Sequence, residues 1–321
     1  MRKDKIIKEE KFLPKKIKKT VIIVGYSCNN NCLFCVYANK RNSFNKKTTQ
    51  IEEEIIQARK RGATYLEFIG GEMTIRPDFL YLVSLASRLG FETITMATNG
   101  RVLSYEDFAR KLIKAGLTNI IFSLHGHNAE IHDYLTQVPG SFNQLMKGFN
   151  NVKKFLGIKN IGSNTTIVKK NYQYLPQIGE LILRLGVRNS EFIFVDCNEG
   201  GARNSFEELV PRISEAAIFI RHCLSLGKRK KVPHWHIRYV PLCYFNDYLD
   251  QISELFEREH FHTEHLGPDF INLNVEESRP RVGRLKPDKC KFCELYDRCE
   301  GIWKNYFYHY GDEELKPVLK Q

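Results

Sequence analysis

Three cysteines lie close together in the sequence, directly after an apolar, β-branched run. The segment Cys28-Asn-Asn-Asn-Cys32-Leu-Phe-Cys35 follows residues 21–24, which read VIIV. Three thiols in one loop at the end of a strand can bind three irons of a cubane cluster and leave its fourth iron without a protein ligand. That open iron would be the site of chemistry. A structural zinc loop or a ferredoxin-like electron carrier is the alternative that these three cysteines alone leave open.

A second cysteine group lies near the C-terminus. It comprises the CxxC pair Cys290 and Cys293, the nearby Cys299 and, as the best candidate for a fourth ligand, Cys243. Four thiolates close a metal site, whether iron-sulfur or zinc. The chain has nine cysteines. An odd total, with two tight clusters and three single cysteines, favours metal ligation in a reducing compartment over a disulfide framework.

The elements that must position these thiols follow a regular rhythm. Apolar, β-branched runs alternate with helical patterns as far as about residue 230, which favours a parallel sheet with crossover helices. We predict an α/β fold, a partial (β/α)6 TIM-like barrel with a small C-terminal cysteine-rich extension. Thr49 and Glu52 have the spacing of a helix capping box. The expected strands are 21–24, 65–69, 93–97, 119–124, 161–168 and 191–195.

Polar residues follow several of these strands, at the end of a barrel that carries its chemistry. The second strand is followed by Gly70-Gly71-Glu72, whose glycines allow close backbone approach and whose carboxylate can neutralise an ammonium group. Short hydroxyl and amide side chains can reach a ribose or a carboxylate. The residues that carry such side chains at or near the ends of the next three expected strands are Thr98, Asn99, Ser123 and either Asn164 or Thr166.

The CxxxCxxC spacing, with Phe34 before its last cysteine and GGE one strand later, resembles the radical S-adenosylmethionine (SAM) superfamily. The resemblance implies that Cys28, Cys32 and Cys35 hold a catalytic [4Fe-4S] cluster whose open iron chelates SAM. It also implies reductive cleavage of SAM to a 5'-deoxyadenosyl radical. Met73 stands where the family commonly has proline. The implied cofactor-binding residues are Phe34, Gly70, Gly71, Glu72, Thr98, Asn99, Ser123 and Asn164.

The C-terminal CxxCxxxxxC spacing resembles the SPASM and twitch extensions of radical SAM enzymes, which bind auxiliary iron-sulfur clusters. A full SPASM pattern would have another cysteine where this chain has Trp303. The resemblance therefore implies a single auxiliary [4Fe-4S] cluster in a twitch-like extension, with zinc as the alternative. Its ligands would be Cys243, Cys290, Cys293 and Cys299.

Size and charge set the remaining limits. The chain has 321 residues, a net charge of +12 and no apolar run long enough to span a membrane. We expect a cytoplasmic protein with a basic N-terminal arm at 1–19, the barrel at 20–230 and the extension at 231–321. The charge admits an acidic or nucleic-acid partner, but a mobile arm or solvated face explains it better.

These features lead to one functional hypothesis and its rivals. We expect hydrogen abstraction from a substrate, with peptide or protein modification first among the substrate classes because similar enzymes most often do this. Radical SAM modification of RNA or of a small metabolite is the alternative, and a non-catalytic iron-sulfur carrier or scaffold is a remote one. A flavodoxin or ferredoxin would supply low-potential electrons.

Overall fold

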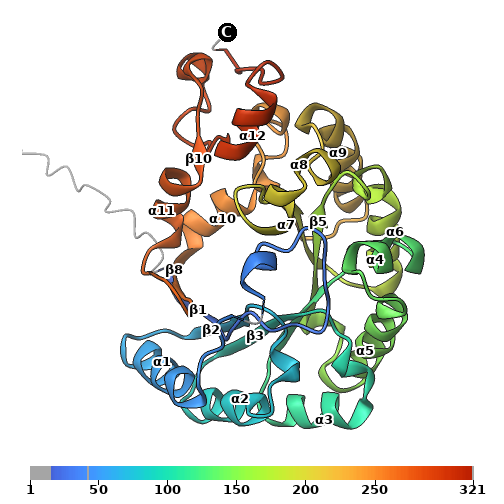
Figure 1. Cartoon of the computed structure of the whole chain (residues 1–321), viewed down its shortest axis with the longest axis vertical. Coiled ribbons are helices and arrows are strands. Elements are labelled where there is room, and N and C mark those ends of the chain that lie inside the picture. Colours follow the sequence, from blue (N-terminus) through green and yellow to red (C-terminus); the bar gives the residue numbers. More distant parts are fainter. Residues whose placement is uncertain (1–15, 42, 320–321) are drawn as a thin grey trace, which may run out of the picture.

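The computed structural model describes residues 16–41 and 43–319. Its main feature is a nine-stranded sheet in the order β7-β6-β5-β4-β3-β2-β1-β8-β9. Strands β1 to β7 pair in parallel with their neighbours, β8 pairs in parallel with β1, and β9 is antiparallel to β8. The helices α1, α2, α3, α5 and α6 lie along the outer side of the curved sheet (Figure 1). This arrangement confirms the predicted α/β partial barrel.

The sheet strands are β1 (Ile17–Ile23), β2 (Tyr65–Ile69), β3 (Thr93–Thr98), β4 (Asn119–Ser123), β5 (Ile161–Ile167), β6 (Asn189–Phe194), β7 (His234–Arg238), β8 (Phe261–Leu266) and β9 (Ile271–Asn272). The helices before residue 230 are α1 (Thr48–Lys60), α2 (Phe79–Arg88), α3 (Glu106–Lys114), α4 (Ala129–Thr136), α5 (Ser141–Leu156), α6 (Leu175–Leu185), α7 (Gly200–Asn204), α8 (Phe206–Leu209) and α9 (Ile213–Arg229). Each of the six predicted strands is present, with ends that differ by a few residues.

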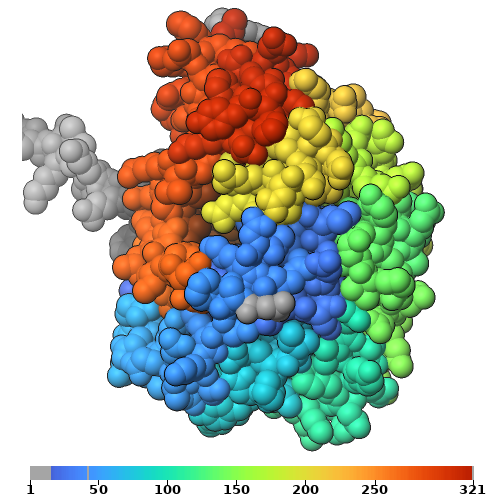
Figure 2. Space-filling view, viewed as in Figure 1, coloured from blue at the N-terminus to red at the C-terminus, as the bar shows by residue number. Residues whose placement is uncertain are grey.

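The C-terminal part contributes three strands to the barrel sheet and also forms a separate two-stranded sheet. Strand β7 extends the β6 edge, and β8 and β9 extend the β1 edge, so the predicted boundary at residue 230 falls before three strands of the sheet. The remaining elements of this part are α10 (Ser253–His260), α11 (Val275–Val282), β10 (Arg284–Leu285), β11 (Ile302–Trp303) and α12 (Lys304–Tyr310). Figure 2 shows the last, red segment packed on the yellow segment around residues 200–210.

Two local predictions need correction. The basic arm was expected to run through residue 19, but β1 begins at Ile17, and Lys19 is paired with Glu67 inside the sheet at 2.5 Å. The rest of the arm, residues 1–15, lies outside the described residues. The capping box at Thr49 and Glu52 is wrong. Helix α1 begins at Thr48, and Lys47 is its N-cap. The side chain of Gln50, and not that of Glu52, accepts the backbone amide proton of the N-cap residue.

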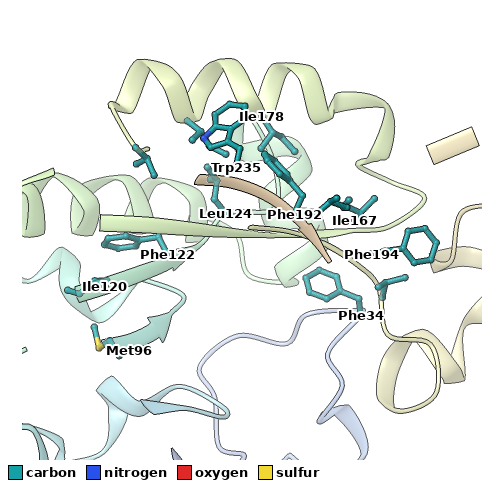
Figure 3. Close-up of a cluster of buried hydrophobic side chains, with 14 of the residues drawn as sticks. Phe34, Met96, Ile120, Phe122, Leu124, Ile167, Ile178, Phe192, Phe194 and Trp235 are labelled. Atoms are coloured by element: carbon teal, nitrogen blue, oxygen red, sulfur yellow. The ribbon is translucent and has the colours of Figure 1, made fainter. Parts of the chain in front are cut away.

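The core explains why the strands are so apolar. A parallel sheet covered on both faces buries both sides of its strands, which favours continuous β-branched runs. Residues 20–26, which contain the VIIV run, are all buried. The core continues to the site, since the ring of Phe34 is buried and points toward the strand ends that carry Ile167 and Phe194 (Figure 3). The cysteine loop is therefore anchored in the barrel core.

Candidate active site

One cavity of about 340 Å³ opens at the carboxyl ends of the strands. The loops after β1 and β2 and the ends of β3 to β7 all contribute to its wall. Most of the residues predicted from the sequence line it: Cys28, Cys32, Phe34, Cys35, Gly70, Gly71, Glu72, Asn99, Ser123 and Asn164. Thr98 does not. The volume falls in the range of ordinary ligand sites.

The loop that carries the first cysteine group (Cys28, Cys32 and Cys35) is held by backbone contacts. The amide of Leu33 donates to the carbonyl of Leu135, and the amide of Gly201 donates to the carbonyl of Cys35. A Cβ on Gly201 would lie 1.8 Å from the Leu33 carbonyl oxygen, and one on Gly200 would lie 2.2 Å from that of Cys35. The two glycines at the start of α7 therefore clamp the cysteine loop, a role that the sequence analysis missed.

The three thiols suit an iron-sulfur cluster better than one ion. Burial raises the pKa of Cys28 to about 11 and that of Cys32 to about 12, while the charge of Arg41 acts in the opposite direction. These thiols are protonated until a metal displaces the protons. Within residues 16–41 and 43–319, no three His, Cys, Asp or Glu side chains are placed to hold a single metal ion. In a cubane each thiolate bonds a different iron, so its ligands need not meet at one point.

The Gly-Gly-Glu loop lies directly against the segment before Cys28. The amide of Gly71 donates to the Gly25 carbonyl, and that of Glu72 donates to the Ser27 carbonyl. A Cβ on Gly71 would stand 2.0 Å from the Ser27 oxygen, so only glycine allows this approach. Both amides are used inside the protein, and the loop can offer its carbonyl oxygens to a bound ammonium group.

Glu72 and Thr98 act as a pair behind this loop. The Glu72 carboxylate is buried and accepts bonds from the Thr74 hydroxyl at 2.6 Å, the Thr98 hydroxyl at 2.8 Å and the Asn99 amide at 2.8 Å. Burial raises its pKa, and these hydrogen bonds act against that rise. The Thr98 hydroxyl also accepts from the Gly100 amide. Thr98 was expected to contact SAM, but the structure places it outside the cavity wall, where it orients Glu72.

Polar side chains from β3, β4 and β5 form one wall of the cavity. Ser123, Asn164 and Thr166 line it, and their side chains make no hydrogen bond to any residue in the described ranges. Asn164 and Thr166 are two residues apart on β5 and share a face. Asn99 ties this wall to the cysteine loop, because its side-chain Nδ2 donates to Oδ1 of Asn29 at 2.7 Å. The wall offers free donors and acceptors for the polar groups of a ligand.

His125 also lines this wall. Its Nδ1 accepts the Thr166 amide proton, and the His125 amide in turn donates to Nδ1 of His132. Both rings are therefore neutral and carry their proton on Nε2. Burial lowers the pKa of His125 to about 3 and that of His132 to about 4. The cap of α4 is Asn128, whose side chain accepts the Ile131 amide proton.

These two histidines predict a fall in stability with acidification. In the unfolded chain each ring gains a proton below about pH 6.5, whereas the folded rings resist protonation. The stability is present above that pH and is lost as the pH falls toward 4, by on the order of 2 kcal/mol for each ring. Urea unfolding at pH 7 and pH 4.5 measures the slope. His132→Gln keeps an acceptor for the His125 amide and should flatten the slope, and an unchanged slope would contradict this assignment.

Three further cavity residues escaped the sequence analysis as site residues. Arg41 follows the cysteine loop, Asp196 lies two residues after the end of β6, and Tyr239 directly follows β7. Burial raises the pKa of Asp196, and its carboxylate accepts the Asn198 amide proton at 2.9 Å. Arg41 makes no hydrogen bond or ion pair with the residues that the structure describes. Only the strand-end position of Asp196 was readable from the sequence, since β7 itself was not predicted.

The second cysteine group (Cys243, Cys290, Cys293 and Cys299) gathers around a separate cavity of about 20 Å³. Backbone amides point at its sulfurs: those of Leu242 and Gly301 donate to Cys299, and that of Val318 donates to Cys293. Amide donors to sulfur are typical of thiolate-ligated metal centres. The donor set of four thiols fits an iron-sulfur cluster or zinc by its chemistry, and here too no three side chains in the described ranges are placed to hold a single ion.

Comparison with known families and proteins agrees with this geometry. A sequence model described as the Radical SAM superfamily matches residues 22–182. A probable GTP 3',8-cyclase of Saccharolobus solfataricus is 26% identical over 259 residues, which are 79% of this chain and 72% of that protein. An AdoMet-dependent heme synthase of Methanosarcina barkeri is 30% identical over 161 residues, which are 50% of this chain and 45% of that protein. The chain therefore spans less than half of the heme synthase.

Two solved structures share the fold. Streptococcus suis SuiB bound to its precursor peptide SuiA matches with a TM-score of 0.66 and 14% identity, over 94% of this chain and 74% of SuiB. The anSMEcpe enzyme with bound AdoMet and the Cp18Cys peptide matches with a TM-score of 0.66 and 13% identity, over 95% of this chain and 93% of that one. At these identities the likeness shows the fold alone. Among the described residues, no helix is long and apolar enough to cross a membrane.

Proposed function

The chain belongs to the radical SAM superfamily of enzymes, and we propose that its first cysteine group binds a [4Fe-4S] cluster with one open iron that chelates SAM. When bound, the cluster supplies an electron that cleaves SAM, and the resulting 5'-deoxyadenosyl radical abstracts hydrogen from a substrate. A low-potential flavodoxin or ferredoxin would provide the electron, and the net charge of +12 suits an acidic donor protein of this kind.

One observation carries this proposal. The three thiols, the Gly-Gly-Glu loop and the free polar wall of β4 and β5 come from distant parts of the chain and line the same cavity. A structural zinc loop or a simple electron carrier requires the thiols but has no need of such a wall. The cavity has room for an organic ligand directly beside the thiols, which is what SAM chemistry requires.

The residues around the cavity divide the task of holding SAM. The Gly70 and Gly71 carbonyls would accept from its ammonium group, and Glu72 fixes the loop in place. Ser123 and Asn164 would bond its carboxylate or ribose hydroxyls. Phe34 packs edge to face with His125 at 4.8 Å between ring centroids, and these two rings would border the adenine. The buried, apolar ring of Phe34 would exclude water from the place where the radical forms.

The second cysteine group would hold one auxiliary [4Fe-4S] cluster, with zinc as the alternative. We expect roughly four irons per chain to remain when Cys28, Cys32 and Cys35 are all changed to alanine, because a cubane contains four. Iron, labile sulfide and zinc measured in the anaerobically reconstituted variant give the answer. Zinc in place of iron would make the extension a structural element.

We propose a peptide or protein side chain as the substrate. The two structural neighbours are described with bound peptides, and each aligns with nearly the whole of this chain, the extension included. An extension beside the barrel mouth offers a surface along which an extended chain can lie. The support for this step is the shared architecture and not the identity of any residue.

A small anionic metabolite is the second candidate, and Arg41 favours it. Its guanidinium lines the cavity without a partner among the described residues and would pair with a phosphate or carboxylate. The relatives found by sequence are described as GTP 3',8-cyclases and heme synthases, which are small-molecule enzymes by name. Modification of RNA remains an alternative that the same cation would serve.

Formation of 5'-deoxyadenosine discriminates among these candidates. The reconstituted enzyme is given SAM, a strong reductant and fractions of a cell extract from the source organism. A macromolecular fraction that stimulates the reaction and loses its effect after protease treatment supports the peptide proposal. Stimulation by the small-molecule filtrate supports a metabolite, and loss of the effect after ribonuclease supports RNA. An Arg41→Gln variant should respond less to a metabolite and equally to a peptide.

A further inference from the structure

Tyr239, at the end of β7, has a backbone conformation that needs a cause. Its φ is +68°, in the left-handed region that a tyrosine rarely adopts. The other two non-glycine residues with positive φ in the described ranges are Gln137 and Lys231. They follow helices α4 and α9, where this conformation is a common helix ending. Tyr239 follows a strand, so its surroundings must hold it in place.

The C-terminal extension supplies what holds Tyr239. The Tyr239 amide donates to the Glu254 carboxylate at 2.6 Å, and Arg284 donates to the Tyr239 carbonyl at 3.4 Å. The Arg284 guanidinium lies 5.1 Å from the Tyr239 ring centroid and 4.0 Å from that of Trp303. The Tyr239 and Trp303 rings meet edge to face at 4.7 Å. Arg284 and Trp303 are partners in the β10–β11 pair, so this hairpin clamps Tyr239.

Arg284 is buried with too few partners for its charge. Its side chain is 0% exposed, and its nearest carboxylate oxygen, on Glu254, lies 3.5 Å away. Its Nε and Nη2 groups have no hydrogen-bond partner among the described residues. The β10–β11 pair also borders the second cysteine group, because Lys286 directly follows β10, Gly301 directly precedes β11, and both line the cavity of that group. A thiolate-ligated metal centre in that group would add negative charge near this buried cation, whose ion pair with Glu254 is long.

The clamp controls one side of the main cavity. Tyr239 and Asp196 line it at the ends of β7 and β6, and the Tyr239 hydroxyl makes no hydrogen bond to the described residues. The loop after Asp196 is tied to the same hairpin, because the Asn198 side chain donates to the Gly283 carbonyl at 2.7 Å. The residue after Gly283 is Arg284. The Tyr239 phenol, which can donate a hydrogen bond, and the Asp196 carboxylate, which can accept one, therefore line the same side of the cavity. The β10–β11 segment supports that side.

We propose that Asp196 and Tyr239 form a subsite for a substrate group that both donates and accepts hydrogen bonds, an amide or a hydroxyl. Arg284 is the positioning residue that links this subsite to the metal centre of the second cysteine group. The inference rests on the proposed function, because it requires a metal centre in the second cysteine group and a substrate in the main cavity. Loss of that metal centre would release Arg284 and, through it, Tyr239.

Hydrogen exchange at the Tyr239 amide tests the link without substrate or turnover. Arg284→Met keeps the length of the side chain and removes its charge, and it should speed this exchange at least tenfold. The pair Cys290→Ala and Cys293→Ala, which empties the second centre, should do the same. Arg76→Met is the control, because Arg76 is a largely buried arginine that pairs with Asp78 at the start of α2 and makes no hydrogen bond or ion pair with Tyr239 or Glu254 among the described residues. A hydrogen-exchange rate at the Tyr239 amide that stays the same after loss of the second metal centre would overturn the link.

The subsite has its own test, which uses whichever extract fraction stimulates 5'-deoxyadenosine formation. Tyr239→Phe and Asp196→Ala should each raise the amount needed for half-maximal stimulation roughly tenfold, as expected for loss of a substrate hydrogen bond. SAM binding should not change, and Asp196→Asn, which retains an acceptor, should restore part of the effect. An unchanged half-maximal amount would overturn the subsite. A wild-type enzyme that forms no 5'-deoxyadenosine would instead overturn the proposed function and leave the exchange result standing.

Discussion

A Cys32→Ala variant should lose the first cluster completely and with it all cleavage of SAM. Two thiols cannot hold a cubane in a loop whose backbone is already fixed by its contacts with Gly201 and Leu135. Iron should fall from roughly eight per chain to roughly four, since each cubane contains four irons. Formation of 5'-deoxyadenosine should fall below detection. Iron analysis and mass spectrometry of the reaction measure the two effects.

The matched control for this variant is Cys223→Ala. Cys223 is a buried cysteine that lies on α9, packed near Gly179 and Trp235 and away from both cysteine groups. Its replacement should leave iron content and SAM cleavage unchanged and cost about 1 kcal/mol of unfolding free energy. Cleavage of SAM that persists in Cys32→Ala would show that this loop does not hold the catalytic cluster.

The second large effect is expected from Gly201→Ala. The added Cβ would stand 1.8 Å from the Leu33 carbonyl oxygen, which is backbone and cannot rotate away. The cysteine loop must then move, and we expect a loss of about 3 kcal/mol in unfolding free energy together with most of the first cluster. Thermal unfolding and the iron content of the reconstituted variant measure both consequences.

Gly140→Ala separates this effect from a general intolerance of glycine replacement. No atom lies within 4 Å of the Cβ that it would add, and only its positive φ of 81° opposes the change, at about 1 kcal/mol. The first cluster should remain intact in this variant. A Gly201→Ala protein with full iron content would mean that α7 does not clamp the cysteine loop.

The sequence predicted the parts of the fold that depend on local pattern. The segment 65–69 reads YLEFI, is mostly apolar and is followed by two glycines, and the structure has a strand at those same positions. The radical SAM resemblance, which rested on three cysteines, Phe34 and the Gly-Gly-Glu loop, is confirmed by the family match. Short motifs of this kind are visible because their spacing along the chain is itself the chemical requirement.

The missed features depend on contacts between distant segments. Strand β7 contains His234, His236 and Arg238 and does not look like a buried strand until it pairs with β6. Because β7 was not predicted, the sequence analysis could not place Tyr239 at the end of a strand. Thr98 was assigned to SAM from its position, yet its hydroxyl turns to Glu72, a partner 26 residues away. Which of two polar neighbours faces a cavity is decided by packing that the sequence alone does not display.

The central claim is that the first cluster keeps one iron open for SAM. Electron paramagnetic resonance of the reduced protein tests it directly, in a Cys290→Ala and Cys293→Ala background that removes the signal of a second cluster. Addition of SAM should change the spectrum of the remaining [4Fe-4S] cluster, because the amino and carboxylate groups of SAM bind the open iron. A spectrum that is identical with and without saturating SAM would contradict the claim and leave a cluster that only carries electrons.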